Sequence, residues 1–360
     1  MKVCVVVTNS IWYDPRVRKQ LLQYKQIAGI EVYGVGLKCS RYNKEKVESF
    51  PCKIYLADID EKLKGKQSKI LSKIARERQK WKYVYKEILR EKPDVIHAND
   101  LDALIPAYMA QKKLKCKLIY DSHEIYVENN NFIGRKVLKF IYSKIEKHIL
   151  KKVDLMVCVS NAAAEYFVKK YKIKKPLVVT NCAIQKEIYK GVEVKNEGFE
   201  VLNHGQFYAG RGYDIMIKAC EYLRDYPEIK LAIRGFGTLE HELREKVEEN
   251  GYNNFIFYQP VTVQELIPMA ARSMVGVAIT EPICLNFELS VSNKLFEYAA
   301  AGLPVIMSDI PEHRYLNEKY RFGIILKENT PHDLALAIKK LYTDKTFYEL
   351  GLYRRSWHNG

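Results

Sequence analysis

The chain has 360 residues, of which 48% are hydrophobic and 28% charged, with a formal net charge of +16. That length fits two domains of ordinary size, and the composition is that of a soluble globular protein with no apolar run long enough to span a membrane. The eight cysteines stand singly without a CxxC pair, and the first residues are too strand-like for a signal peptide, so we expect a reducing cytoplasm and neither a disulfide framework nor a zinc site.

The first half of the chain alternates short apolar segments with helical patterns. We expect helices near 15–28, 68–91, 101–114, 134–152 and 160–171. The strands expected between them are at 2–8, 31–36, 53–57, 94–98, 117–121, 154–159 and 177–180. Strands that are apolar throughout and joined by helices form a parallel sheet covered on both faces. This half is therefore predicted to be a doubly wound α/β domain.

The second half repeats the same alternation. Strands are expected near 199–204, 230–234, 254–258, 275–279, 304–307 and 323–326, and helices near 211–224, 238–249, 263–271, 292–301 and 331–343. The polar segment 181–196 marks the boundary. We predict two doubly wound parallel-sheet domains facing across a cleft, at 1–182 and 183–345, followed by a last helix at 346–360.

Two segments, 62–92 and 135–152, combine many Lys and Arg residues with an apolar stripe at helical spacing. Such helices suit an anionic membrane surface, and a nucleic-acid backbone would attract the same charges. The stripes also fit a simpler interpretation, in which they are core and the charges form a solvated face. All three interpretations stay open at this point.

Polar and glycine clusters follow most of the predicted strands. In the first half they are 8–10, 97–100 and 121–124, and in the second half 204–206, 234–237 and 280–282. Ligands of open parallel sheets lie beyond the carboxyl ends of the strands. Random loops would scatter these clusters over both ends of the sheet, so their placement favours a binding function.

The segment 285–309 carries the most suggestive pattern. It begins as a polar loop, and Ser292 and Asn293 then cap a short helix that Gly302 and the following proline end. Lys294 in the first helical turn would attract an anion such as a phosphate, and Glu297 one turn later could accept hydrogen bonds from a ribose diol. The alternative is an ordinary helix cap.

Two glycine-containing turns could approach a phosphate closely: 205–212, which includes Arg211, and 234–238, which includes Gly235 and Gly237. Arg211 would bind phosphate bidentately, and together with Lys294 it could stabilise a diphosphate leaving group. A plain strand–helix turn explains the glycines equally well. A surface charge beside a turn is the corresponding alternative for Arg211.

His123 leaves the end of a first-domain strand and would face the cleft. No nucleophile turn supports a catalytic triad, and with Glu124 beside it a capping pair is favoured over a metal site. The Asp-x-Asp doublets at 58–60 and 100–102 could hold a divalent ion with a nucleotide sugar, but N-capping is the default explanation of the second.

These motifs together resemble the retaining, nucleotide-sugar-dependent glycosyltransferases of the GT-B fold, in the group-one family and its Asn-Lys-Leu-Phe-Glu-Tyr branch. The resemblance covers most of the chain in the right order. It is carried by YDPRVR at 13–18, VIHAND at 95–100, YDSHE at 120–124, DLMVCVSN at 154–161, VVTN at 178–181, residues 205–212 and 234–237, and NKLFEY at 293–298 with AGLPV at 301–305.

The resemblance implies a role for each matching residue. His123 would touch the transferred sugar, Arg211 and Lys294 would neutralise the diphosphate, and Glu297 would bind the ribose. The remaining implied donor-binding residues are Gly205, Gln206, Arg234, Gly235, Gly237, Leu285, Asn286, Phe287 and Asn293. Asn9, Asp14, Arg16 and Asp100 would shape the acceptor side. Such enzymes commonly need no metal, and residues 347–357 look like the start of a helix that returns to the first domain.

The chain departs from the family pattern at two positions. Many relatives have a glutamate where Leu289 stands, and neither Glu281 nor Glu288 is in register to replace it. Many also have an arginine where Gln206 stands, which leaves Arg211 and Lys294 to neutralise more of the charge.

We therefore expect retaining transfer of a hexosyl group from a nucleoside-diphosphate sugar to a lipid-linked or polysaccharide acceptor in bacterial cell-surface glycan synthesis. We expect the protein at the inner face of the cytoplasmic membrane, with an anionic membrane surface and no nucleic acid as partner. The alternatives are a sugar-nucleotide epimerase or hydrolase of the same fold and a non-catalytic binder of anionic lipid or nucleic acid.

Overall fold

A computed structural model describes residues 1–11, 14–38, 50–57, 69–183 and 196–344, and the side chains of 69–74 are not described. The chain forms two compact units, 1–179 and 180–360. The boundary expected from the sequence, after residue 182, is a few positions further along. The predicted doublet at 58–60 and the predicted last helix at 346–360 lie outside the described residues.

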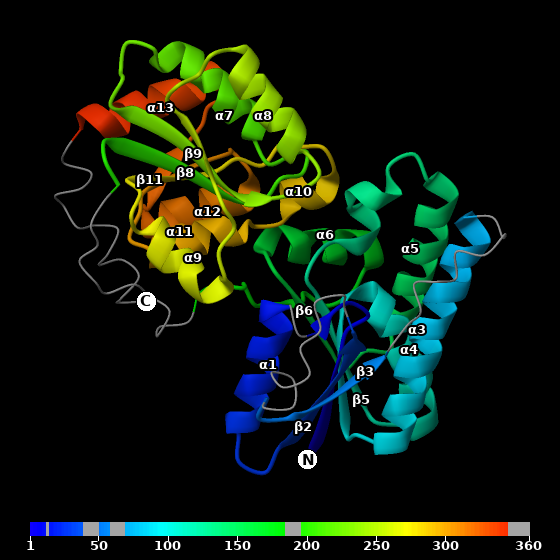
Figure 1. The fold of residues 1–360 in the computed structure, drawn as a ribbon. Helices are drawn as coiled ribbons and strands as arrows, with labels where there is room; N and C mark the ends of the chain where they lie inside the picture. Colours follow the sequence, from blue (N-terminus) through cyan, green and yellow to red (C-terminus); the bar gives the residue numbers. More distant parts are fainter. Residues whose placement is uncertain (12–13, 39–49, 58–68, 184–195, 345–360) are drawn as a thin grey trace. The chain divides into compact units, whose positions relative to one another are not determined.

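Unit 1 is a parallel sheet with helices on both faces (Figure 1). Its strands run in the order β3-β2-β1-β4-β5-β6-β7, and every neighbouring pair is parallel. The elements are β1 Lys2–Val6, α1 Pro15–Gln26, β2 Glu31–Leu37, β3 Lys53–Ala57, α3 Lys69–Glu91, β4 Val95–Asn99, α4 Asp100–Leu114, β5 Lys117–Ser122, the 3-10 turns η2 Tyr126–Glu128 and η3 Asn130–Phe132, α5 Lys136–Leu150, β6 Leu155–Cys158, α6 Asn161–Tyr171 and β7 Leu177–Val178.

Helix α1 shows how the sequence sets these boundaries. Asp14 accepts hydrogen bonds from the backbone N–H groups of Arg16 and Val17, and Pro15 occupies the first helical position, where its missing N–H costs nothing. Val17 and Leu21 then pack against alternate residues of β1 in one buried cluster. Helices α3 and α4 pack against each other on the opposite face of the sheet (Figure 1).

Unit 2 repeats the arrangement with the strand order β10-β9-β8-β11-β12-β13, again entirely parallel. Its elements are β8 Phe199–Gln206, α7 Tyr213–Ala219, which continues as the 3-10 turn η5 Cys220–Leu223, β9 Ile229–Phe236, α8 Glu240–Glu249, β10 Phe255–Tyr258, α9 Val263–Ala270, β11 Val275–Ala278, α10 Leu285–Leu289, α11 Asn293–Ala300, β12 Val305–Met307, α12 Pro311–Tyr320, β13 Gly323–Ile325 and α13 Pro331–Thr343.

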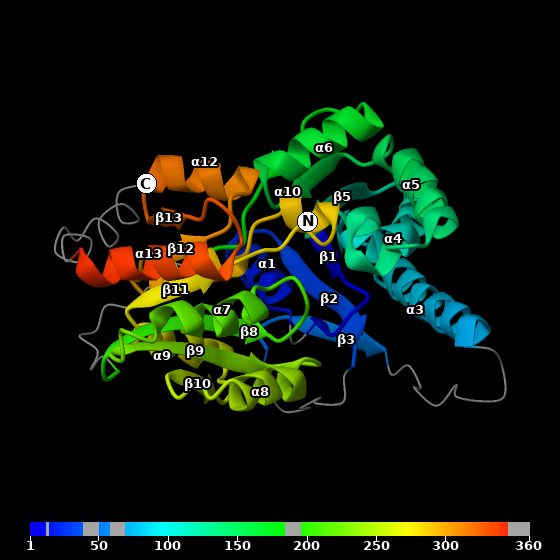
Figure 2. The same ribbon diagram turned by 90° about the horizontal axis from the view of Figure 1, so that it is seen from above.

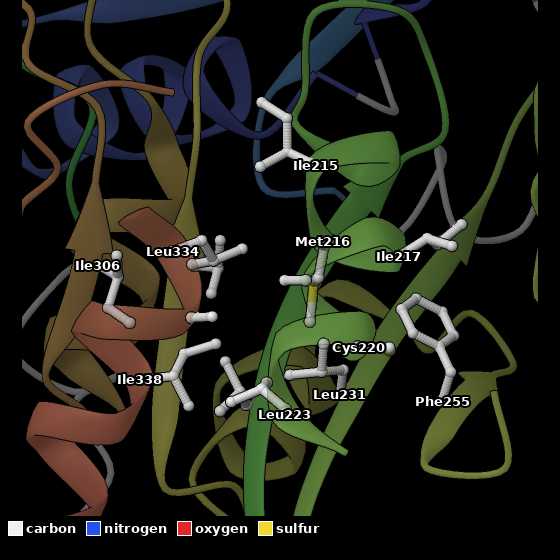
Figure 3. Packing of buried hydrophobic residues seen from close by; sticks show 14 of the residues in the cluster. Ile215, Met216, Ile217, Cys220, Leu223, Leu231, Phe255, Ile306, Leu334 and Ile338 are labelled. Carbon is white, nitrogen blue, oxygen red and sulfur yellow. The ribbon is translucent and has the colours of Figure 1, made fainter. Parts of the chain in front are cut away.

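Two hydrophobic layers hold unit 2 together, one on each face of its sheet. Figure 2 views this sheet from the side on which α7, α8 and α13 lie. Because side chains alternate along a strand, neighbouring residues serve different layers: Val201 packs with α7 and α13, whereas Leu202 packs with α9 and α11. Figure 3 shows the first layer, in which Leu334 and Ile338 of α13 approach the side chains of α7 over the sheet.

The structure confirms two doubly wound parallel-sheet domains, and most predicted elements lie within a few residues of their observed bounds. One expectation was wrong: the polar loop expected from residue 285 is the short helix α10. The helix predicted near 211–224 is confirmed; it begins at Tyr213, and its last turn, to Leu223, is a 3-10 turn. Helix α12 was not predicted, because its sequence PEHRYLNEKY buries few apolar side chains and so lacks a clear periodicity.

In each sheet there is one point at which the order of successive strands reverses: between β1 and β4 in unit 1, and between β8 and β11 in unit 2. The crossovers run one way from β1 and the other way from β4 in unit 1, and likewise from β8 and β11 in unit 2. Such a reversal opens a crevice at the carboxyl ends of the central strands. The polar clusters after β4, β5 and β8 lie at this end of their sheets.

Candidate functional site

In unit 2, Lys294 of α11 is held at the carboxyl end of β8. The residue is only 8% exposed, and its Nζ donates a hydrogen bond of 2.6 Å to Oδ1 of Asn203 on β8. Its ammonium also lies 5.3 Å from the centre of the Tyr213 ring. A Cβ at Gly205 would lie 3.2 Å from Cε of Lys294, so glycine at that position leaves the lysine its space.

The charge of Lys294 is poorly supported in this environment. Burial lowers its pKa to about 7, and the charge of Arg211 acts in the same direction, whereas Glu297 opposes them only in part. A bound anion would stabilise the protonated ammonium that burial disfavours. This is the electrostatic property expected of a site for a phosphate or diphosphate.

Arg211 lies in the loop between β8 and α7. Its guanidinium stands 4.5 Å over the centre of the Phe287 ring, and burial lowers its pKa. Nδ2 of Asn203 donates a hydrogen bond of 3.2 Å to the backbone carbonyl of Arg211. Asn203 therefore connects the loop of Arg211 to the ammonium of Lys294, and the structure brings the two predicted cations together.

Glu297 lies one turn after Lys294 on α11. Its Oε2 is 2.8 Å from Nε2 of His204, the residue that follows Asn203 on β8. Sequence reasoning placed His204 in a strand-end cluster but gave neither it nor Asn203 a role. The available signal was the pair of buried polar residues that directly follows the apolar pair Val201 and Leu202 inside a predicted strand.

The predicted glycines serve close packing between strand ends. Gly235 has φ +150°, and a Cβ there would lie 1.8 Å from the backbone oxygen of Gly205; a Cβ at Gly237 would lie 2.5 Å from the backbone of Phe207. Only residues without a side chain fit both positions. This requirement explains the glycines whether or not a phosphate binds there.

Two other predicted donor-binding residues, Arg234 and Gln206, have their described contacts elsewhere than with the side chains of Arg211, Lys294 and Glu297. Arg234 stacks 4.5 Å over the ring of Tyr258 and donates a hydrogen bond from Nη1 to the backbone oxygen of Gln259 at 3.2 Å. Gln206 is exposed at the end of β8, and its backbone oxygen accepts a hydrogen bond from the Tyr213 hydroxyl.

The segment 285–287 forms the start of α10. Asn286 is buried, Leu285 is half-buried, and Phe287 supplies the ring under Arg211. Glu281 accepts a hydrogen bond of 3.0 Å from the backbone N–H of Gly212, so its carboxylate supports the Arg211 loop.

The start of α11 differs in one detail from the predicted cap. Ser292 is the N-cap and Asn293 the first helical residue, as the sequence indicates, but the Ser292 side chain makes no capping hydrogen bond. The helix is anchored instead by the contacts of Lys294 and Glu297 with β8.

In unit 1, His123 follows β5 and joins a polar cluster. Its Nε2 lies 2.8 Å from Oδ1 of Asn99, its backbone N–H donates to Asp100, and its Nδ1 is 3.8 Å from Oδ2 of Asp100. Burial disfavours the charged imidazole, but Asp100 and Asp121 outweigh it, so the pKa of His123 is raised. Burial raises the pKa of Asp100. The contacts of His123 are thus with Asn99 and two aspartates, and the expected capping pair with Glu124 is wrong, since Glu124 accepts from Asn129.

Asp121 is the centre of this cluster. It accepts hydrogen bonds of 2.6 Å from Nη2 of Arg16 and from Nε2 of Gln20, and His97 lies 3.4 Å away. Burial would raise the pKa of Asp121, but His123, His97 and Arg16 hold it well below its usual range. Arg16 is buried in this ion pair, so it fixes α1 to β5.

The other predicted acceptor-side residues lie at helix starts. Asp14 caps α1, and Asn9 reaches its carboxylate at 3.5 Å. Asp100 begins α4 with φ +64°, while Asn99 is the N-cap, so the expected capping role of Asp100 was wrong; Asp102 accepts instead from the hydroxyl of Thr8. In the part of the chain that the structure describes, no group of three or more His, Cys, Asp or Glu side chains is arranged to hold a metal ion.

Two family profiles match the chain, one on each half. Residues 20–187 match the family Glycosyltransferase Family 4, and residues 198–344 match Glycosyl transferases group 1. No protein of curated function matches the chain by sequence.

Solved structures with the same fold cover nearly all of the chain. Sucrose-phosphate synthase of Thermosynechococcus elongatus is 15% identical with a TM-score of 0.79, and the match covers 99% of this chain and 94% of that one. HepE of Anabaena, in complex with UDP and glucose, is 14% identical with a TM-score of 0.71, covering 99% and 94%. A candidate UDP-N-acetylglucosamine 2-epimerase of Listeria monocytogenes is 13% identical with a TM-score of 0.64, covering 98% and 90%. Both units therefore have the folds found in GT-B glycosyltransferases.

Proposed function

Because the chain is a glycosyltransferase built from these two family domains, we propose that it transfers a hexosyl group from a nucleoside-diphosphate sugar to a hydroxyl of a lipid-linked or polysaccharide acceptor, with retention of the anomeric configuration. Unit 2 binds the donor, and unit 1 supplies the acceptor side. The reaction belongs to bacterial cell-surface glycan synthesis.

The observation that carries the proposal is the pair of cations at the end of β8. Lys294 is buried, its pKa is lowered by burial and by Arg211, and both residues are attached to Asn203. Two positive groups that burial and mutual repulsion destabilise are a site prepared for a multivalent anion. Glu297, attached to the same strand, adds the acceptor that a ribose diol requires.

In the proposed reaction, the bond from the anomeric carbon to the diphosphate oxygen breaks, and a bond from that carbon to the acceptor oxygen forms on the same face of the sugar. A donor phosphate oxygen takes the acceptor proton. Arg211 and Lys294 stabilise the charge that develops on the leaving diphosphate. These residues supply the positive charge, so we propose transfer without a metal, and activity should persist in a chelating buffer.

The proposed acceptor side rests on the cluster around His123. Its imidazole is held by Asn99 and two aspartates; burial disfavours the charged form, but Asp100 and Asp121 outweigh burial and raise the pKa of His123. A charged imidazole at the carboxyl end of β5 would donate hydrogen bonds to sugar hydroxyls. Asn9, Asp14, Arg16 and Asp100 surround the ends of β1, β4 and β5, where they shape the backbone that meets the acceptor.

We also propose attachment to the inner face of the cytoplasmic membrane through α5. Side chains on the first half of this helix and just before it are exposed although they are apolar: Ile133 61%, Val137 75%, Phe140 62% and Ile141 46%. Between residues 133 and 152 the one acidic residue is Glu146, which is buried, whereas seven are Lys or Arg. None of the helices in the described part of the chain is long and apolar enough to cross a bilayer.

A cationic surface with exposed apolar side chains matches the interface of an anionic bilayer. Replacing Val137 and Phe140 by Ser should weaken binding to vesicles that contain phosphatidylglycerol, while Lys112→Gln on α4 serves as a control for general charge. Equal binding of the double variant and the wild type would remove the membrane proposal.

The enzymatic proposal is tested by turnover with nucleotide sugars and acceptors. Arg211→Ala and Glu297→Ala should each lower kcat/KM by about 100-fold, from the loss of a few kcal/mol of transition-state stabilisation. Arg224→Ala is the matched control, since Arg224 is exposed and forms an ion pair with Glu221, away from the Lys294 cluster. Full activity of both site variants would refute the proposal.

Two further assays separate the rival functions. Product formed from the donor without an acceptor would indicate an epimerase or hydrolase. A non-catalytic binder of anionic polymers would lose affinity steeply with salt and show no saturable binding of one nucleoside diphosphate.

A further inference from the structure

His204 is joined to α11 by side chain and by backbone. Its Nε2 lies 2.8 Å from Oε2 of Glu297, and its backbone N–H donates a hydrogen bond of 2.8 Å to the hydroxyl of Tyr298, the next residue on the helix. The imidazole is only 1% exposed. One strand residue thus fixes two consecutive helix residues.

Packing against His204 and Gly276 in turn fixes the ring of Tyr298. Its ring centre lies 4.4 Å from that of the His204 ring, and the ring occupies space over β11 that Gly276 leaves open, since a Cβ there would lie 2.3 Å from Cγ of Tyr298. The imidazole therefore rests on a fully buried side chain. Neither ring can rotate without disturbing the core, so the direction in which His204 presents Nε2 is set by packing.

The hydrogen-bonding pattern assigns the tautomer of His204. Its Nδ1 is buried and has no hydrogen-bond partner in the described part of the chain. An N–H at Nδ1 would be buried without an acceptor, which costs more than an unpaired lone pair. The proton therefore lies on Nε2, which donates to the carboxylate of Glu297.

We propose that His204 is a positioning residue for the donor nucleotide: it holds the carboxylate of Glu297 in the orientation that receives the ribose hydroxyls. This inference rests on the proposed function. Within the described residues, the other oxygen, Oε1, receives no hydrogen bond. The Glu297 side chain is 28% exposed, so part of it is accessible to a ligand.

The role of His204 is entropic and directional. An unsupported glutamate samples several rotamers, and binding must then select one, at a cost in free energy. With Oε2 held by His204, Glu297 is oriented before the nucleotide arrives. The benefit reaches only ligands with ribose hydroxyls, which predicts that the donor is a ribonucleoside diphosphate sugar.

The experiment compares two variants and two forms of one ligand. His204→Val removes the N–H that donates to Glu297 and places an apolar side chain in the buried strand. His204→Gln keeps an N–H that can reach the position of Nε2. Calorimetry measures the affinity of each protein for whichever of UDP, GDP and ADP binds the wild type best, and for its 2′,3′-dideoxy analogue.

We expect His204→Val to bind the ribonucleotide about tenfold more weakly, with a raised KM for the donor and a kcat near that of the wild type. His204→Gln should recover most of the affinity. The dideoxy analogue should bind all three proteins equally, because it has no hydroxyls for Glu297 to receive. A disturbed fold would instead weaken both ligands alike.

The outcomes distinguish this inference from the proposed function. If the wild type binds no nucleoside diphosphate, the proposed function fails and takes the inference with it. If the wild type binds but His204→Val binds the ribonucleotide as tightly, or loses the same factor for the dideoxy analogue, the inference alone is overturned. If His204→Val does not fold, His204→Gln decides, since it must keep the preference for the ribonucleotide over the analogue.

Discussion

Raising the pH through neutrality should weaken binding of the nucleotide sugar, because Lys294 must carry its proton to hold the diphosphate. The pKa of Lys294 is lowered from 10.5 to about 7 by burial and by the charge of Arg211. A bound diphosphate reverses the balance, since its negative charge favours the ammonium. The site therefore takes up a proton on binding at any pH above about 7.

The size of the effect follows from this pKa. Below about pH 7 the lysine is already charged, and affinity should not vary with its titration; above it, each pH unit removes up to about tenfold. At about pH 8.5 the free site is charged about 3% of the time, so affinity should be about 30-fold lower than at about pH 6. If the pKa of Lys294 returned to its ordinary value in the complex, the free energy that couples protonation of Lys294 to binding of the diphosphate would be about 5 kcal/mol, which is its upper limit.

Isothermal titration calorimetry with a nucleoside-diphosphate sugar measures both quantities. The sugar blocks the terminal phosphate, so the ligand itself does not titrate near neutral pH. Repeating the titration in buffers of different ionisation enthalpy should show uptake of about one proton per ligand at about pH 8. Lys294→Met should bind more weakly and lose the proton uptake. An affinity that stays constant between about pH 6 and about pH 8.5, or unchanged uptake in the methionine variant, would refute the reasoning.

Three further predictions concern stability, measured by urea denaturation. Gly276→Ala should lower the free energy of unfolding by about 1–3 kcal/mol because its Cβ meets the Tyr298 ring; no loss would show that the ring can move. Arg16→Met should cost about 3–5 kcal/mol by leaving the buried Asp121 carboxylate without its ion pair, and a loss near zero would contradict the pairing. Glu146 is buried with the hydroxyls of Tyr120 and Tyr171, and burial raises its pKa; the native state therefore holds a proton that the unfolded state releases, and stability should fall as the pH rises from about 4.5 through the raised pKa. Glu146→Gln should remove that fall, and an unchanged pH profile would count against it.

The fold was largely predictable because each strand and most helices carry their own signal. The apolar runs at 2–8 and 275–279 and the repeated alternation with helices indicate parallel sheets without any knowledge of contacts. Helix α12 was not predicted because its helical signals lie only at its two ends: Pro311 at the first position and Arg321, in the left-handed conformation, after the last. Of its buried residues, Leu316 is apolar, whereas Glu312 and His313 are residues that a hydrophobic pattern does not count.

The cations and the carboxylate of the candidate site were predictable from the sequence, but the residues that hold them in place were not. Arg211, Lys294 and Glu297 were named from residue type and position, and the structure brings them to one end of β8. Close packing already explains the predicted glycines: Gly235 and Gly237 lie against backbone atoms, and Gly205 leaves space for the Lys294 side chain. The contact of Arg234 with Tyr258 was not predictable, because a position at a strand end does not determine the neighbour towards which a side chain turns.

Asn203 and His204 could not be assigned from the sequence, since their partners stand about ninety positions further on. Polar residues inside an apolar strand would be costly unless something pairs with them. That something is α11, which the chain reaches only after three more strands of the same sheet. The strand order explains why the two meet: β11 pairs directly with β8, so the segment after β11 returns to the end of β8. The reversal of the strand order between β8 and β11 thus brings the residues of α11 to their partners on β8, which residue type alone does not reveal. A pair of buried polar residues near the end of the first strand of such a domain is therefore a signal to look for charged partners in the helix that follows the reversal.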